Sequence, residues 1–219
     1  MWNSQVIIML LEGIRDTLYM TLASTLFGYI IGLPMGIVLT VTDKDGIRPN
    51  VAVYKVLDVI SNLLRSIPFI ILLIVLIPFT RFVVGRSYGS TATIVPLTIA
   101  AAPYIARMVE SSLKEVDAGI IEAARSMGAS DFQIVTKVML VEARTSLIVG
   151  ATISLGTILG YSAMAGTVGG GGLGDIAIRY GYTRWQTDIM VVTVVLLVIL
   201  FQIFQTIGMK IANRLDRRK

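Results

Sequence analysis

The sequence predicts an all-α membrane protein with five transmembrane helices, and two features of the chain support this fold class. Of its 219 residues, 55% are hydrophobic and only 15% are charged, whereas soluble domains carry about 25% charged residues. The apolar residues also form long runs, such as 67–79 and 189–204. A helix needs about 20 apolar residues to cross a bilayer, whereas a barrel strand would alternate over about 10 residues.

Five apolar runs each predict one span within a single transmembrane domain covering residues 1–219. The predicted spans are 14–40, 57–79, 91–109, 145–167 and 188–209. The first run lacks a preceding basic segment and a small-residue cleavage site, so we expect it to remain as an anchor. A polar loop at about 114–141 separates the third span from the fourth.

Basic residues flank the predicted spans unequally. One side carries Lys44, Arg48, Lys55, Arg107, Lys114, Arg125, Lys137, Arg144, Lys210, Arg214, Arg217, Arg218 and Lys219, and the other carries Arg15, Arg81, Arg86, Arg179 and Arg184. Because Lys and Arg gather in cytoplasmic loops, we expect the N-terminus outside and the C-terminus in the cytoplasm. The basic tail is expected to meet anionic membrane lipid. Basic residues at membrane edges do not form a nucleic-acid surface.

Several kinds of chemistry are excluded by residue types that the chain lacks. Histidine and cysteine are absent, which removes disulfides, Cys/His metal sites and histidine acid–base chemistry. The acidic residues lie in loops or at span ends, whereas ion-coupled carriers keep an ionisable group near the midplane. We therefore expect no catalytic residue, metal or cofactor in this chain, which is not an enzyme.

Two nucleotide-binding motifs are also missing. No G-x-x-x-x-G-K-[ST] loop occurs, so any ATP hydrolysis belongs to a separate protein. The run GGGGLG at 169–174 follows an apolar helix rather than a strand, which excludes a dinucleotide fold. We interpret this run as a turn or a short re-entrant element.

Glycines in two spans predict close helix packing. Gly28, Gly32 and Gly36 recur every four residues in the first span, and Gly156 and Gly160 do so in the fourth. Small residues at this spacing let another helix approach closely. For the first span we favour packing within one subunit over a dimer contact.

Polar and flexible side chains in two spans are candidates for a translocation pathway or gate. They are Ser66, Pro68, Ser154, Tyr161, Ser162 and Met164. Met164 offers a flexible apolar surface for a gate or a substrate. The hydroxyl groups could instead bond back to their own helices, so helix packing remains an alternative.

The polar loop contains the stretch EAARSMGASDFQIVTKVML, residues 122–140. It predicts a first helix ending at a left-handed Gly128 and a second helix that begins at a Ser130 capping box and runs through Val138. We expect Ala123 and Ala124 to form a small face that a partner backbone could approach. From the residues alone, a plain connector is the alternative.

This stretch resembles the EAA loop of ABC-importer membrane subunits. The shared residues are Glu122, Ala123, Ala124, Gly128, Val138 and Leu140, and Val141 stands where the family usually has proline. The resemblance implies a type I ABC importer fold in which this loop forms a coupling helix. By the same resemblance, Glu122, Ala123, Ala124 and Gly128 couple the chain to a cytoplasmic ATPase.

Two further segments narrow the resemblance. The run RSIPF at 65–69 resembles the second-span motif of amino-acid importers, and residues 161–182 are similar to methionine-uptake permeases. The implied protein is a bacterial cell-membrane permease for an amino acid, in particular methionine. It would act as a homodimer with an ABC ATPase dimer, which uses ATP and Mg²⁺, and an external substrate-binding protein. The alternatives are another polar amino acid, an ion-coupled carrier or channel, or a structural membrane scaffold.

Overall fold

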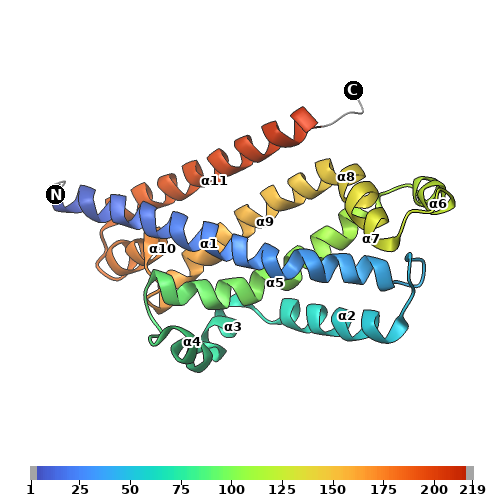
Figure 1. Ribbon diagram of the computed structural model, residues 1–219. Helices are drawn as coiled ribbons and strands as arrows, with labels where there is room; N and C mark the ends of the chain where they lie inside the picture. Colours follow the sequence, from blue (N-terminus) through green and yellow to red (C-terminus); the bar gives the residue numbers. More distant parts are fainter. Residues whose placement is uncertain (1–3, 216–219) are drawn as a thin grey trace. The chain divides into compact units, whose positions relative to one another are not determined.

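A computed structural model describes residues 4–215, all of whose regular elements are helices (Figure 1). The contacts of the chain divide it into two compact units. Unit 1 holds residues up to 27, 67–101 and 155–205, and unit 2 holds 28–66, 102–154 and residues from 206 onward. The basic tail residues Arg217, Arg218 and Lys219 lie outside the described residues.

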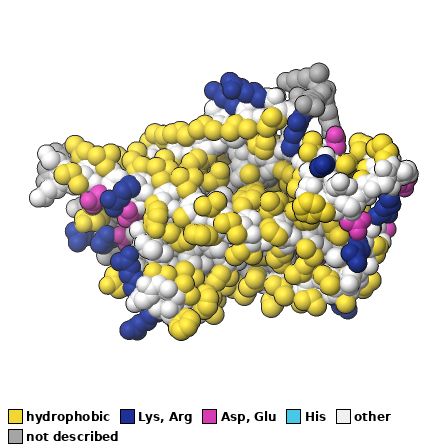
Figure 2. Space-filling model, in the orientation of Figure 1, with side chains coloured by type: hydrophobic (Ala, Val, Ile, Leu, Met, Phe, Trp, Pro, Cys, Tyr) yellow, Lys and Arg dark blue, Asp and Glu magenta, His cyan; other side chains and the backbone are white. Residues whose placement is uncertain are grey.

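Four of the five predicted spans correspond to long continuous helices. They are α1 (Ser4–Thr42), α5 (Ser90–Lys114), α9 (Arg144–Ala165) and α11 (Thr187–Leu215). Each is long and apolar enough to cross a membrane. Hydrophobic side chains cover much of the surface in Figure 2, as expected for helices that face lipid.

The second predicted span, 57–79, is not one continuous helix. This segment is divided into α2 (Val51–Ser66), α3 (Phe69–Val75) and α4 (Ile77–Val84), and α2 with α3 counts as a broken span or a re-entrant loop. Pro68 causes the first break, because its ring pushes the preceding residue out of the helical region. Its own backbone is extended, with φ −55° and ψ 132°.

The core of unit 1 forms around the glycine-rich run. Here η2 (Gly166–Val168), α10 (Gly172–Ile176) and η3 (Ala177–Tyr182) follow α9. Positive φ angles at 169, 171 and 172 make the chain turn, which glycine allows without a Cβ clash. The backbone N–H of Leu173 then donates to the Thr17 hydroxyl at 2.9 Å. The run is therefore a turn that starts a short helix, as predicted.

The buried apolar residues around this run are Leu10, Leu159, Leu173, Ile176, Ile189 and Leu200.

In unit 2, glycines of α1 bring that helix against α5. A Cβ on Gly32 would lie 2.6 Å from the Ala102 carbonyl oxygen, and one on Gly36 would lie 2.5 Å from that of Ala106. Gly28, the third residue of the pattern, is also buried. The spacing thus serves packing within one chain, since side chains at these positions would hold the helices apart.

The two α9 glycines differ from each other. A Cβ on Gly156 would meet the Phe201 ring at 2.5 Å, whereas one on Gly160 would have no atom within 4 Å. Both residues were predicted to pack helices, but within this chain only Gly156 has a neighbour that needs its small size. Gly160 leaves an open surface on α9.

Candidate coupling and translocation sites

The polar loop joins α5 to α9 and begins with a capped helix, α6 (Ala118–Ser126). The Asp117 side chain accepts from the Gly119 N–H at 2.8 Å and caps the helix start. Gly128 has φ +81° and donates its N–H to the Arg125 carbonyl oxygen at 3.0 Å. The helix therefore stops in a left-handed turn, as the sequence predicted.

The second arm contains α7 (Asp131–Gln133), the π-helix η1 (Ile134–Met139) and α8 (Leu140–Glu142). Ser130 forms the predicted capping box with Gln133, at 2.9 and 3.3 Å. The helical path runs to Glu142, beyond the predicted end at Val138. Val141 lies inside α8, and unlike the usual proline it keeps a backbone N–H and imposes no break.

The two alanines of the loop do not face the same side. Ala124 is only 5% exposed, because α6 packs against η1, while Ala123 and Glu122 are exposed. Successive helical residues point about 100° apart. When Ala124 faces η1, Ala123 therefore points in another direction and stays open. The expectation of a two-alanine face is thus corrected to Ala123 alone. Ala124 instead lets the two arms approach.

The loop also exposes large apolar side chains that its sequence pattern did not lead us to predict. Met127 is 82% exposed and Phe132 is 77% exposed, on either side of the turn at Gly128. Apolar side chains this exposed in a polar segment are typical of a protein–protein contact. Their signal was visible in the sequence, since both are large apolar residues within the polar island.

In unit 1, the residues around the Pro68 break form an aromatic contact. Phe69, the first residue of α3, stacks on Tyr161 of α9 with ring centres 4.6 Å apart and planes at 6°. Pro68 is exposed and Tyr161 is partly exposed. Met164, one turn further along α9, is 50% exposed. This part of the predicted pathway therefore has side chains that a substrate could reach.

The serine hydroxyl groups of the predicted pathway bond to their own helices. Ser154 donates to Gly150 at 2.8 Å, and Ser162 donates to Leu159 at 2.7 Å. Both serines are buried. Ser66 also bonds back along its helix, but its side chain is exposed. The geometry favours helix packing for Ser154 and Ser162 and leaves Ser66 open to a ligand.

Residues 4–215 contain no group of three or more Asp, Glu, His or Cys side chains placed to hold a metal ion. The candidate sites are therefore a contact loop and a set of pathway side chains. Neither brings together a nucleophile and a base of the kind that covalent catalysis uses.

Long apolar helices joined by a polar helix–turn–helix loop define a polytopic membrane protein. The chain belongs to the family of binding-protein-dependent transport system inner membrane components, whose model matches residues 19–219. The resemblance to importer membrane subunits is thereby confirmed, as is the all-α membrane fold.

Relatives match most of the chain. A probable D-methionine transport system permease protein MetI of Vibrio cholerae is 48% identical over 210 residues, which are 96% of this chain and 93% of the relative. The D-methionine transport system permease protein MetI of Escherichia coli K12 is 54% identical over 158 residues, covering 72% of this chain and 73% of the relative.

Chains of solved structures also align with nearly the whole of this chain. A chain of the inward-facing MetNI methionine ABC transporter aligns at a TM-score of 0.97 and 49% identity, covering 99% of this chain and 100% of that chain. A chain of an amino acid ABC transporter crystallised with histidines aligns at 0.78 and 20% identity, covering 96% and 95%. The second match shows a shared fold.

Proposed function

We propose that this chain is the permease subunit of an ATP-driven ABC importer that moves methionine across the cell membrane into the cytoplasm. The observation that carries the proposal is the 49% identity over 99% of the chain to a chain of a methionine ABC transporter. Relatives named for D-methionine transport support the same substrate.

The permease works as a homodimer in the cytoplasmic membrane of a bacterium. Four or five spans are few for enclosing a gated path, so a second copy completes it. The N-terminus lies outside and the polar loop and C-terminus lie in the cytoplasm, because the basic residues flank the spans on that side. An external binding protein delivers methionine to the outer face.

A cytoplasmic ABC ATPase dimer supplies the energy, using ATP and Mg²⁺ on its own chains. Each ATPase subunit receives one polar loop, with Glu122, Ala123 and the exposed Met127 and Phe132 at the contact. Gly128 sets the angle between the two arms. ATP-driven closure of the ATPases displaces the loop, and the flanking α5 and α9 carry the displacement into the spans.

The translocation pathway uses the exposed side chains near the Pro68 break. In unit 1, Pro68 and Met164 are open to a ligand, and the stack of Phe69 on Tyr161 serves as the gate. Ser66, two residues before Pro68 in the chain, is exposed as well. The thioether of methionine, whether in the substrate or in Met164, makes favourable contacts with aromatic rings. Ser154 and Ser162 hold the shape of α9.

Proteoliposomes containing the permease, the ATPase and the binding protein test this function. Labelled methionine is expected to accumulate only when ATP is present on the ATPase side, since this chain holds no energy source. An excess of unlabelled polar amino acids tests the alternative substrates by competition. Uptake driven by an ion gradient, without the ATPase, would contradict the proposal and support a carrier or channel.

The exposed apolar residues of the loop give a second prediction. Phe132→Ser and Met127→Ser are each expected to weaken ATPase binding about tenfold, as for a moderate interface anchor. The measurement is a titration of detergent-solubilised permease with the labelled ATPase. Phe82→Ser is the matched control, because Phe82 is equally exposed on α4 and lies far along the chain from the loop. Unchanged affinity in both loop variants would exclude these side chains from the contact.

A further inference from the structure

Helix α5 carries a buried carboxylate in unit 2, the unit that also holds the polar loop. Glu110 is 5% exposed, and its oxygens accept from Arg107 at 2.7 Å, Lys114 at 2.8 Å and the Tyr54 hydroxyl at 3.2 Å. A buried charge is tolerated only when it is paired and hydrogen-bonded. Glu110 is therefore the centre of a cluster.

Two further acidic residues extend this cluster to other segments of unit 2. Arg107 forms an ion pair with Asp58 of α2 and donates to the Asn62 side chain at 3.1 Å. Lys114 forms an ion pair with Asp43, just beyond α1, at 2.6 Å. The hydrogen bond from Lys114 holds the pKa of Asp43 below its ordinary value of 3.8, so Asp43 stays ionised at neutral pH. We call Asp43, Tyr54, Asp58, Arg107, Glu110 and Lys114 together the α5 charge cluster.

Helix α2 depends on this cluster for its attachment to α5. The one buried residue of α2 is Ser61, and apolar side chains such as Val56, Val59 and Leu63 are exposed. Apart from the half-buried Leu57 and Leu64, burial of apolar surface contributes little to holding α2 within its unit. The polar bonds of Tyr54 and Asp58 to α5 take that role.

The polar loop reaches the same cluster by two connections. Only residues 115–117 separate the end of α5 from α6. Arg125 of α6 also donates to the Ile47 carbonyl oxygen at 2.7 Å, in the α1–α2 connection that carries Asp43. A displacement of α6 is thus passed both to α5 and to this connection.

We propose that Glu110 and Asp58 are positioning residues that make α2 move with α5 when the polar loop is displaced. Helix α2 ends at Ser66, directly before the break at Pro68, so its movement reaches the candidate pathway. The inference rests on the proposed function, because it assigns the cluster to transfer of the ATPase's motion. Without the cluster, the ATPase still binds the loop and hydrolyses ATP, but α2 does not follow.

The first test measures ATP hydrolysed per methionine imported in proteoliposomes of the complete transporter. Asp58→Asn leaves Arg107 paired with Glu110, so the fold is retained. We expect ATP hydrolysis to stay within about twofold of wild type while uptake falls roughly tenfold, as for other mutations that affect coupling. Glu110→Gln is expected to raise the ratio of ATP to methionine further.

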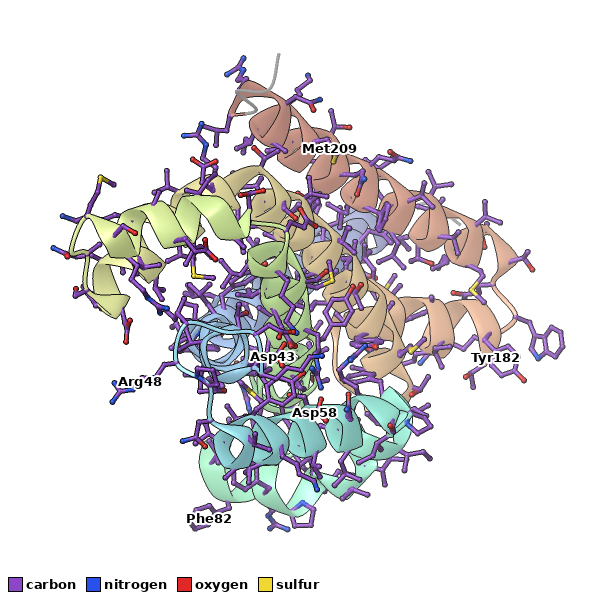
Figure 3. All side chains as sticks on the ribbon, turned by 90° about the vertical axis from the view of Figure 1, so that its right-hand side faces the viewer. Asp43, Arg48, Asp58, Phe82, Tyr182 and Met209 are labelled. Carbon is purple, nitrogen blue, oxygen red and sulfur yellow. The ribbon has the colours of Figure 1, made fainter. Side chains whose placement is uncertain are left out.

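Arg48→Gln is the matched control for these variants. Arg48 lies on the same α1–α2 connection as Asp43. In Figure 3, however, the Arg48 side chain points away from α5, whereas Asp43 and Asp58 lie beside that helix. The control should change neither uptake nor hydrolysis. A proportional fall of both activities in Asp58→Asn would indicate a purely structural role and overturn the proposal. An unchanged ratio in both cluster variants would overturn it as well.

A second test does not depend on transport. The chain has no native cysteine, so Val56→Cys on α2 and Ser111→Cys on α5, both exposed, can carry a clean pair of spin labels. In the purified transporter we expect the distance distribution between the labels to widen in Asp58→Asn and Glu110→Gln. An unchanged distribution would overturn the proposal. A widened distribution in the variants, combined with no methionine import by the wild-type transporter, would retain the cluster's role and contradict the proposed function.

Discussion

Ala123→Arg is expected to abolish methionine uptake while leaving the permease folded. Ala123 is exposed on α6, and a bulky cation there would be buried without a partner when the ATPase approaches. Loss of about 3 kcal/mol from this contact corresponds to a decrease of about 100-fold in ATPase affinity. The measurements are ATP-dependent uptake, co-purification with the ATPase and the Tm of the isolated permease.

Two comparisons make this prediction specific. Ala118→Arg places the same side chain five residues earlier on the exposed helix α6, about 140° around the axis, and should weaken ATPase binding far less. Ala124→Arg should instead lower the Tm, because Ala124 is packed between α6 and η1. Normal uptake by Ala123→Arg would remove the polar loop from the ATPase contact.

The largest effect on stability is expected for Gly36→Val. A Cβ at this position would lie 2.5 Å from the Ala106 carbonyl oxygen and 2.7 Å from the Val109 Cβ, and neither atom can move without shifting α5. Overpacking of this kind costs about 3 kcal/mol, which lowers the Tm by about 6–12 °C in a chain of this length. Thermal unfolding of the detergent-solubilised protein measures this change.

Gly160→Val is the control for the glycine prediction. It makes the same change in another long helix, at a position where a Cβ meets nothing within 4 Å. We expect the Tm of the isolated chain to remain unchanged. If Gly160→Val impairs assembly of the homodimer instead, the open surface on α9 contributes to the interface between the two copies. Equal Tm values for both glycine variants would contradict the helix contact at Gly36.

Features set by neighbouring residues could be predicted from the sequence. Long apolar runs located four of the spans, since hydropathy and helix length are properties of one continuous segment. The turn of the polar loop was also predictable, because Gly128, Ser130 and Gln133 act on backbone groups a few residues away. The pattern of Gly32 and Gly36 indicated a packing face, although the partner helix was not identified.

Features that depend on distant residues were not predicted. The direction of Ala124 depends on how η1 folds back onto α6, and repeated alanines alone do not distinguish the packed side from the open one. Glu110 looked like an acidic residue at the end of a span. Its burial is explained by Tyr54, Arg107 and Lys114, which the helices bring together around one carboxylate.

The amino-acid pattern alone established a helical membrane protein, the polar loop between its third and fourth spans and the absence of histidine and cysteine chemistry. These conclusions follow from composition and local spacing, which do not require the chain to be folded. The packed structure decided that Ala123 rather than Ala124 is open to a partner, and that α2 is tied to α5 by charges. Both depend on contacts between segments far apart in the chain, because burial and charge pairing arise only when those segments meet.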